Sequence, residues 1–125
     1  MILGLGTDLC EVSRMREETA ASAPGFAEAV FTPGEIAYCR SKHDPAQHFA
    51  ARFAAKEACV KALAAGGGRG SFWQDIEVVH AEGGRPLLHL IGRAERIAAD
   101  LGVRRAHLSL SHTRETAVAV VVLED

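Results

Sequence analysis

The first residues alternate between two kinds of side chain, which predicts a β-strand over Ile2 to Leu9. Its odd positions, 3, 5, 7 and 9, are mostly apolar, whereas its even positions carry two glycines and end at Asp8. Glycines inside a strand mark the close approach of another backbone or of a ligand. The pattern suits tight packing against a helix and a ligand site about equally, so both interpretations stay open.

Helical periodicity and helix-start signals follow this strand. Ser13 to about Ala21 and Gly25 to Phe31 predict short helices. Thr32-Pro33-Gly34-Glu35 is a capping box with proline at the first helical position, and Asp44-Pro45-Ala46-Gln47 repeats the arrangement with an aspartate. The second signal opens the strongest predicted helix, about Pro45 to Ala65, which the following run of glycines should end.

The second half of the chain is rich in predicted strands. They cover Asp75 to Ala81, Pro86 to Leu90, Arg105 to Ser111 and Thr116 to Leu123, with a helix over Gly92 to Leu101 between the two pairs. Short turns join the strands of each pair, which is typical of antiparallel pairing. We therefore expect a compact α+β domain in which a mainly antiparallel sheet packs against one long helix.

Charged side chains interrupt the apolar stripe of the long helix. At about 100° per residue, five apolar side chains fall within one arc of roughly 100°. They are Phe49, Phe53, Val60, Leu63 and Ala64. Lys56 lies inside this arc. Glu57 lies at its margin, Lys61 one step further round, and Arg52 on the other flank.

These charges allow two interpretations. Glu57 and Lys61 stand four residues apart, so they could form a surface ion pair, and a lysine in an apolar stripe can extend its ammonium group to water. Alternatively, Glu57 and Asp8 hold Mg²⁺, which takes one or two carboxylates together with waters and substrate phosphate oxygens. Lys56, Lys61 and Arg52 would then neutralise phosphate groups.

Composition limits the classes of function. Residues 1–125 form one domain's worth of protein, and the net charge of −2 argues against bulk binding of nucleic acid. The longest apolar run is too short to cross a bilayer, and no basic region precedes the first apolar stretch, so we expect neither a membrane partner nor a signal peptide. Three cysteines without C-x-x-C spacing favour a reduced, cytoplasmic setting.

Four motifs occur in order along almost the whole chain. They are Gly4-x-Gly6-x-Asp8-Leu9-x(4)-Arg14, then Arg52-Phe53-Ala54-Ala55-Lys56-Glu57-Ala58-x-x-Lys61-Ala62, then Phe72-x-x-Asp75-Ile76-Glu77 with Gly84-Arg85-Pro86, and finally Ser109-Leu110-Ser111-His112-Thr113. With these motifs the chain resembles the holo-[acyl-carrier-protein] synthases, the small phosphopantetheinyl transferases. The first motif alone would be weak, whereas the second and fourth together are specific.

The resemblance implies the 4′-phosphopantetheinyl transferase fold and a defined reaction. The reaction is transfer of 4′-phosphopantetheine from coenzyme A to a serine of apo acyl carrier protein, which releases adenosine 3′,5′-bisphosphate and serves fatty acid biosynthesis. The family uses Mg²⁺, and its small members are homotrimers that hold coenzyme A between adjacent subunits. A chain this short is also expected to need a neighbouring subunit to complete its site.

The resemblance also implies roles for individual residues. Asp8 and Glu57 would bind Mg²⁺, and Lys61 would contact a phosphate oxygen and support the leaving group. These three form the expected catalytic set, in which Glu57 or a water on the metal is the general base. Arg52 and Lys56 would contact coenzyme A, although Lys56 could instead be structural.

Two further segments are expected near coenzyme A. Ser111 and His112, followed by Thr113, resemble the residues that hold the adenosine phosphate end, from the neighbouring subunit. The glycine-rich loop around Gly68 could direct backbone N–H groups towards phosphate, or simply end the helix. Cys10 stands where a larger class of these transferases has a further carboxylate, and we expect water there.

Docking of an acidic carrier protein calls for a basic and apolar surface. Arg14 and Phe26 match the family in this respect, and Arg16 adds positive charge. The segment 17–30, often basic in the family, has no basic residue here and carries three glutamates. The partner is therefore a less acidic carrier, or docking relies more on apolar contact.

Three alternatives to this function remain. The same transfer could act on a carrier domain of polyketide or nonribosomal peptide synthesis. The chain could instead be a nucleotide-binding oligomer without catalysis, or a structural oligomer whose helix charges are ion pairs. Retention of Asp8, Glu57 and Lys61 argues against both non-catalytic alternatives.

Overall fold

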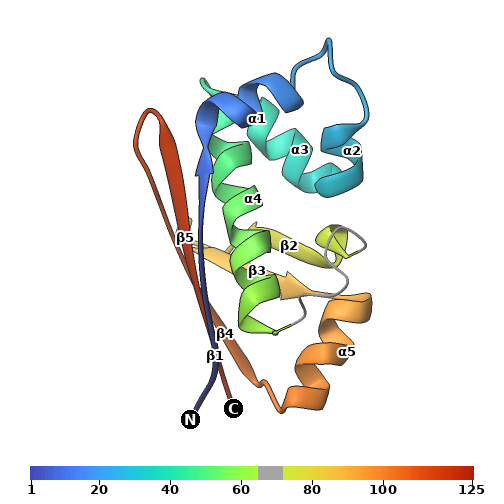
Figure 1. Ribbon diagram of the computed structural model, residues 1–125, viewed down its shortest axis with the longest axis vertical. Helices are drawn as coiled ribbons and strands as arrows, with labels where there is room; N and C mark the ends of the chain where they lie inside the picture. Colours follow the sequence, from blue (N-terminus) through green and yellow to red (C-terminus); the bar gives the residue numbers. More distant parts are fainter. Residues whose placement is uncertain (65–71) are drawn as a thin grey trace.

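The computed structural model describes residues 1–64 and 72–125 of the chain. Its elements follow the predicted order, with differences at their ends (Figure 1). They are β1 (Ile2–Glu11), α1 (Val12–Glu18), α2 (Phe26–Val30), α3 (Pro33–Arg40), α4 (Pro45–Ala62), the 3₁₀ turn η2 (Trp73–Asp75), β2 (Ile76–His80), β3 (Pro86–Leu90), α5 (Gly92–Leu101), β4 (Arg105–His112) and β5 (Thr116–Glu124). The long helix thus ends at Ala62 and not at Ala65, and the glycines predicted to end it lie outside the described residues.

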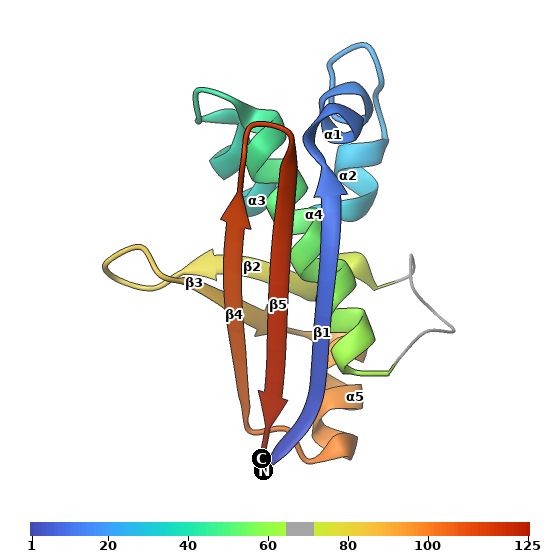
Figure 2. The same ribbon diagram turned by 60° about the vertical axis from the view of Figure 1, so that its left-hand side comes forward.

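Two antiparallel sheets confirm the predicted α+β class. β5 is the middle strand of a three-stranded sheet, with β1 and β4 on either side, and β2 pairs with β3 in a second sheet. α4 runs along one face of the larger sheet, and β2 and β3 run across it (Figures 1 and 2). Among the described residues, no helix is long and apolar enough to span a bilayer.

The glycine face of β1 packs directly against α4. A Cβ atom on Gly6 would lie 1.9 Å from the carbonyl oxygen of Ala58, and one on Gly4 would lie 2.1 Å from that of Ala62. No side chain fits at either position, so the strand and the helix approach each other backbone to backbone. Of the two interpretations that the sequence left open, helix packing explains these glycines.

The apolar face of β1 points away from the core. The side chains of Leu5 and Leu9 are 65% and 67% exposed, and Val120 on β5 lies on the same outer surface. Contiguous exposed apolar side chains on a sheet are typical of a protein–protein contact. We refer to this surface, formed by Ile2, Leu3, Leu5, Leu9 and Val120, as the outer sheet face.

The two predicted capping boxes have different outcomes. At the start of α3, Thr32 Oγ1 accepts from the Glu35 backbone N–H at 3.2 Å, and Glu35 Oε1 accepts from the Thr32 N–H at 2.9 Å, which confirms the first box. At the start of α4, the side chain of Asp44 makes no capping bond. Its carboxylate instead accepts hydrogen bonds from both terminal nitrogens of Arg16, at 2.8 and 3.2 Å. The prediction of a second capping box was therefore wrong.

Candidate active site

The close packing of β1 on α4 brings two predicted site residues into contact. Asp8 lies on the same face of β1 as Gly4 and Gly6, which is the face that meets α4. Lys61 Nζ donates to Asp8 Oδ1 at 2.8 Å and to the Thr7 carbonyl oxygen at 3.1 Å. Two residues 53 positions apart therefore form one charged cluster.

Glu57 lies one helical turn before Lys61 on α4 and is half-buried. Its Oε1 accepts a hydrogen bond from the indole nitrogen of Trp73 at 2.7 Å. No motif in the sequence indicates a site role for Trp73, so this contact was missed from the sequence. Asp8, Glu57, Lys61 and Trp73 together form what we call the carboxylate cluster.

The carboxylate cluster has the donors that Mg²⁺ requires. Both acids offer hard oxygen ligands, and Asp8 already holds a cation, the Lys61 ammonium group. Within the described ranges, no group of three or more His, Cys, Asp or Glu side chains could hold a metal ion. Mg²⁺ does not need one, because it binds proteins through one or two carboxylates and retains waters and phosphate oxygens.

Cys10 does not extend this set of ligands. Its side chain is buried, and burial raises the pKa of the thiol to about 11. A protonated thiol is a poor partner for a hard cation.

Lys56 has a buried position, which favours the structural role over the contact with coenzyme A. The side chain is fully buried and pairs with the equally buried Glu35 at 2.7 Å. Lys56 Nζ also donates to the carbonyl oxygens of Trp73 and Ile76. Burial lowers the pKa of Lys56, while the attraction of Glu35 raises it. A side chain enclosed in this way has no surface to offer a ligand.

Arg52 forms a second charged centre, on the other flank of α4. Its guanidinium carbon lies 4.2 Å from the ring centroid of Tyr38, and its Nη1 donates to the His48 carbonyl oxygen at 3.4 Å. Arg52 is only 2% exposed, yet its Nε and Nη2 have no hydrogen-bond partner among the described residues. Buried donors of a cation without partners are costly, and an anion would satisfy them.

Three histidines surround this centre. The ring of His80 stacks on Tyr38 at 4.6 Å, and the ring of His48 lies 6.1 Å from His112. Burial first, and then the charge of Arg52, lowers the pKa of both His48 and His80. These two imidazoles are therefore neutral at pH 7, so Arg52 supplies the fixed positive charge of this group. We call Tyr38, His48, Arg52, His80 and His112 the arginine cluster.

The predicted C-terminal site residues lie at the end of β4 and in the turn after it. Ser111 and His112 end the strand, and all three residues, Thr113 included, are exposed. Gln47, in the first turn of α4, donates weakly to the Thr113 carbonyl oxygen at 3.5 Å. His112 thus joins the arginine cluster through His48, whereas Gly68 lies outside the described residues.

The two clusters lie on different sides of α4. Arg52 and Glu57 are five residues apart, which corresponds to about 140° around a helix. The core stripe between them carries Lys56. The chain therefore presents the carboxylate cluster and the arginine cluster to different surroundings.

The predicted docking residues are also only partly brought together. The guanidinium carbon of Arg14 lies 4.9 Å from the ring centroid of Phe53, and the ring of Phe26 lies 6.1 Å from the same ring. These two residues form one mixed basic and apolar surface beside α1. Arg16 is instead bound to Asp44.

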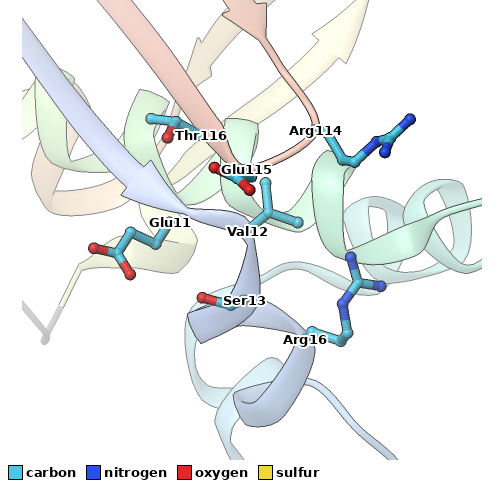
Figure 3. Close-up of a pocket in the computed structure, with 7 residues that line it drawn as sticks. All are labelled: Glu11, Val12, Ser13, Arg16, Arg114, Glu115 and Thr116. Atoms are coloured by element: carbon cyan, nitrogen blue, oxygen red, sulfur yellow. The ribbon is translucent and has the colours of Figure 1, made fainter.

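Arg16 lines a solvent-open pocket of about 530 Å³ between the start of α1 and the β4–β5 turn. In Figure 3, Arg16 and Arg114 extend on one side of this pocket, and Glu11 lies on the other. Its mixed charges make it a less specific anion site than the arginine cluster. Glu11, the first lining residue of this pocket, follows Asp8 by three positions in the sequence.

Comparison with known proteins places this geometry in a family. The family model described as "4'-phosphopantetheinyl transferase superfamily" matches residues 4–121. A holo-[acyl-carrier-protein] synthase from Koribacter versatilis is 49% identical over 125 residues, which is 100% of both chains. One from Moorella thermoacetica is 47% identical and covers 98% of this chain and 94% of its own length.

Solved structures agree with these relatives. A holo-[acyl-carrier-protein] synthase from Neisseria meningitidis superimposes with a TM-score of 0.79 at 31% identity over 100% of both chains. The Helicobacter pylori enzyme, solved in complex with coenzyme A, gives a TM-score of 0.81 at 29% identity and covers 96% of this chain and 99% of its own.

Proposed function

Because the chain belongs to the holo-[acyl-carrier-protein] synthases of the 4′-phosphopantetheinyl transferase superfamily, we propose that it transfers the 4′-phosphopantetheine group of coenzyme A to a serine of apo acyl carrier protein. The chain is thus a transferase. The proposed transfer depends on Mg²⁺, releases adenosine 3′,5′-bisphosphate and serves fatty acid biosynthesis in the cytoplasm. One observation carries the proposal: Asp8 of β1 contacts Lys61 of α4, and Glu57 lies one helical turn before Lys61 on the same helix.

In this cluster, Asp8 and Glu57 hold the divalent cation. When bound, Mg²⁺ would neutralise negative charge on the pyrophosphate of coenzyme A, as in other phosphoryl transfers. Lys61 turns from Asp8 to a phosphate oxygen and offsets charge on the leaving group. The proton of the carrier serine would pass to Glu57 or to a water molecule beside it.

The arginine cluster is assigned to the adenosine end of coenzyme A. The two unpartnered donors of Arg52 would bind the 3′-phosphate, and His112, with Ser111 and Thr113, would complete that contact. Support comes from the chemistry of a buried guanidinium group, which makes charge-assisted hydrogen bonds to phosphate.

We further propose a homotrimer in which coenzyme A lies between adjacent subunits. The outer sheet face exposes Leu5 and Leu9, and an apolar surface of this kind is typically buried against another subunit. The separation of Arg52 from Glu57 around α4 supports the same arrangement. The carboxylate cluster of one subunit and the arginine cluster of its neighbour would bind the two ends of one coenzyme A molecule.

Carrier docking is assigned to the surface formed by Arg14 and Phe26, with Arg16 at its edge. The charge of Arg14 is partly neutralised by Glu18, because Arg14 Nε lies 3.4 Å from a Glu18 carboxylate oxygen. The charge of Arg16 is likewise neutralised by its ion pair with Asp44. This weakens the basic character of the surface and leaves carriers of polyketide or nonribosomal peptide synthesis as a second class of substrate.

The test is a mass measurement on a panel of apo carriers incubated with the protein, coenzyme A and Mg²⁺. We expect a fatty acid carrier to gain the mass of phosphopantetheine. D8N and E57Q should abolish the gain while circular dichroism shows an intact fold. No gain for any carrier would refute the transfer. Wild-type activity in both D8N and E57Q would refute the metal assignment.

A further inference from the structure

Trp73, the only tryptophan of the chain, donates its indole N–H to Glu57 at 2.7 Å, and the proposed transfer leaves this bond unexplained. We infer that Trp73 is a positioning residue, which fixes the orientation of the Glu57 carboxylate for the divalent cation. This inference rests on the metal-binding role proposed above for Glu57.

The backbone of Trp73 is anchored to α4 next to Glu57. Its carbonyl oxygen accepts from Lys56 Nζ at 2.9 Å. Lys56 is itself held by the buried ion pair with Glu35, whose Oε2 accepts from the Val78 N–H at 2.8 Å. The start of η2 is therefore tied, through buried polar contacts, to the helix position that precedes Glu57.

The ring of Trp73 is anchored as well. Its centroid lies 5.8 Å from that of Phe53, one helical turn before Glu57, with the two ring planes inclined by 50°. Packing on Phe53 and the bond from Lys56 leave the indole little freedom to turn. An indole nitrogen only donates, so the contact with Glu57 always engages a carboxylate oxygen as acceptor.

Such a donor matters for a metal ligand. Hydrogen bonds to the ligands of a metal orient them, and loss of such a bond typically costs 10- to 100-fold in metal affinity. W73F keeps an aromatic ring against Phe53 but loses the N–H group. We therefore expect W73F to bind a divalent cation at least about tenfold more weakly than the wild type.

The first test uses Mn²⁺ as a spectroscopic probe, titrated in the presence of coenzyme A and measured by electron paramagnetic resonance. Q74A is the matched control, because Gln74 lies on the same turn but donates to the Glu28 and Phe31 carbonyl oxygens. We expect weaker binding for W73F, unchanged binding for Q74A and no binding for E57Q. Wild-type affinity in a folded W73F would overturn the inference and leave the proposed transfer intact. If the wild type itself bound no Mn²⁺, the metal assignment would fall, and the role of Trp73 with it.

The second test needs no substitution at Trp73. Because the indole bonds to Glu57 and no other tryptophan exists, its fluorescence should change as Mg²⁺ binds. The change should follow the same saturation curve as metal-dependent transfer and be absent in E57Q. Emission that stays constant while Mg²⁺ saturates transfer would overturn the inference, even if W73F did not fold.

Discussion

The Lys61 ammonium group lies 2.8 Å from Oδ1 of Asp8, the carboxylate that we assign to the metal. The Lys61 side chain is 53% exposed. A pair this accessible to water contributes little, about 0–1 kcal/mol, so a divalent cation can displace the lysine at small cost. Lys61 and the metal therefore compete for Asp8 until phosphate attracts the lysine away.

This competition predicts opposite effects of K61M on two measurements. Metal affinity without coenzyme A should rise a few-fold, because the competing charge is gone. The turnover number should fall by about 100-fold, since removing one group that stabilises transition-state charge has effects of this order. Mn²⁺ titration and steady-state transfer measure the two. R85M removes a positive charge at the distant β2–β3 turn and should change neither. Weaker metal binding in K61M would contradict the competition.

A second prediction concerns the unpartnered donors of Arg52. R52M should raise the KM for coenzyme A by about 10- to 100-fold, which corresponds to the loss of one or two hydrogen bonds to a charged group. Dephospho-coenzyme A, which lacks the 3′-phosphate, is the control substrate. Its KM should differ little between R52M and the wild type. An equal loss for both substrates would place the phosphate elsewhere.

Gly6 provides a third test, because its missing side chain sets the distance between β1 and α4. In G6A, a Cβ atom 1.9 Å from the Ala58 carbonyl oxygen must push the strand away. That shift would separate Asp8 from Glu57, so we expect lower stability and loss of transfer. G34A is the matched control: its Cβ would meet two side chains at ordinary distances, the Glu77 carboxylate at 3.4 Å and the Thr32 hydroxyl at 3.9 Å. Normal melting temperature and activity in G6A would contradict the close approach.

Local signals along the sequence predicted local structure well. The box of Thr32 and Glu35 was confirmed because both partners lie within one turn. The box at Asp44 was wrong because Arg16, 28 residues away, takes the carboxylate. No local pattern reports such a long-range competitor.

The candidate site shows the same limit. The helical wheel placed Lys56 in the core stripe. Its pairing with Glu35 could not be predicted, because Glu35 already had a predicted capping role. Trp73, His48 and His80 were missed for a similar reason. Their partners come from other elements, and only the tertiary packing shows which side chains meet.

The outer sheet face leads to a prediction about assembly. L9D places a charge where we expect a subunit contact, so analytical ultracentrifugation should show a trimer for the wild type and a smaller species for L9D. Transfer should be lost together with the trimer, because the two clusters would no longer share one coenzyme A. L101D, on α5, alters a leucine that is 45% exposed and serves as the control. A trimeric L9D, or a fully active monomer, would contradict the interface.

The buried pair of Glu35 and Lys56 leads to a prediction about folding stability. Removal of one partner leaves an uncompensated buried charge, which typically costs about 3–5 kcal/mol. We therefore expect E35Q and K56M each to lower the free energy of unfolding by about this amount, measured by urea denaturation. The double variant should lose less than the sum of the two, because neither charge remains buried alone. Glu35 also caps α3 and accepts from the Val78 N–H, so E35Q should retain part of its polar contacts while K56M retains none. Additive losses in the double variant would mean that the two charges do not stabilise each other.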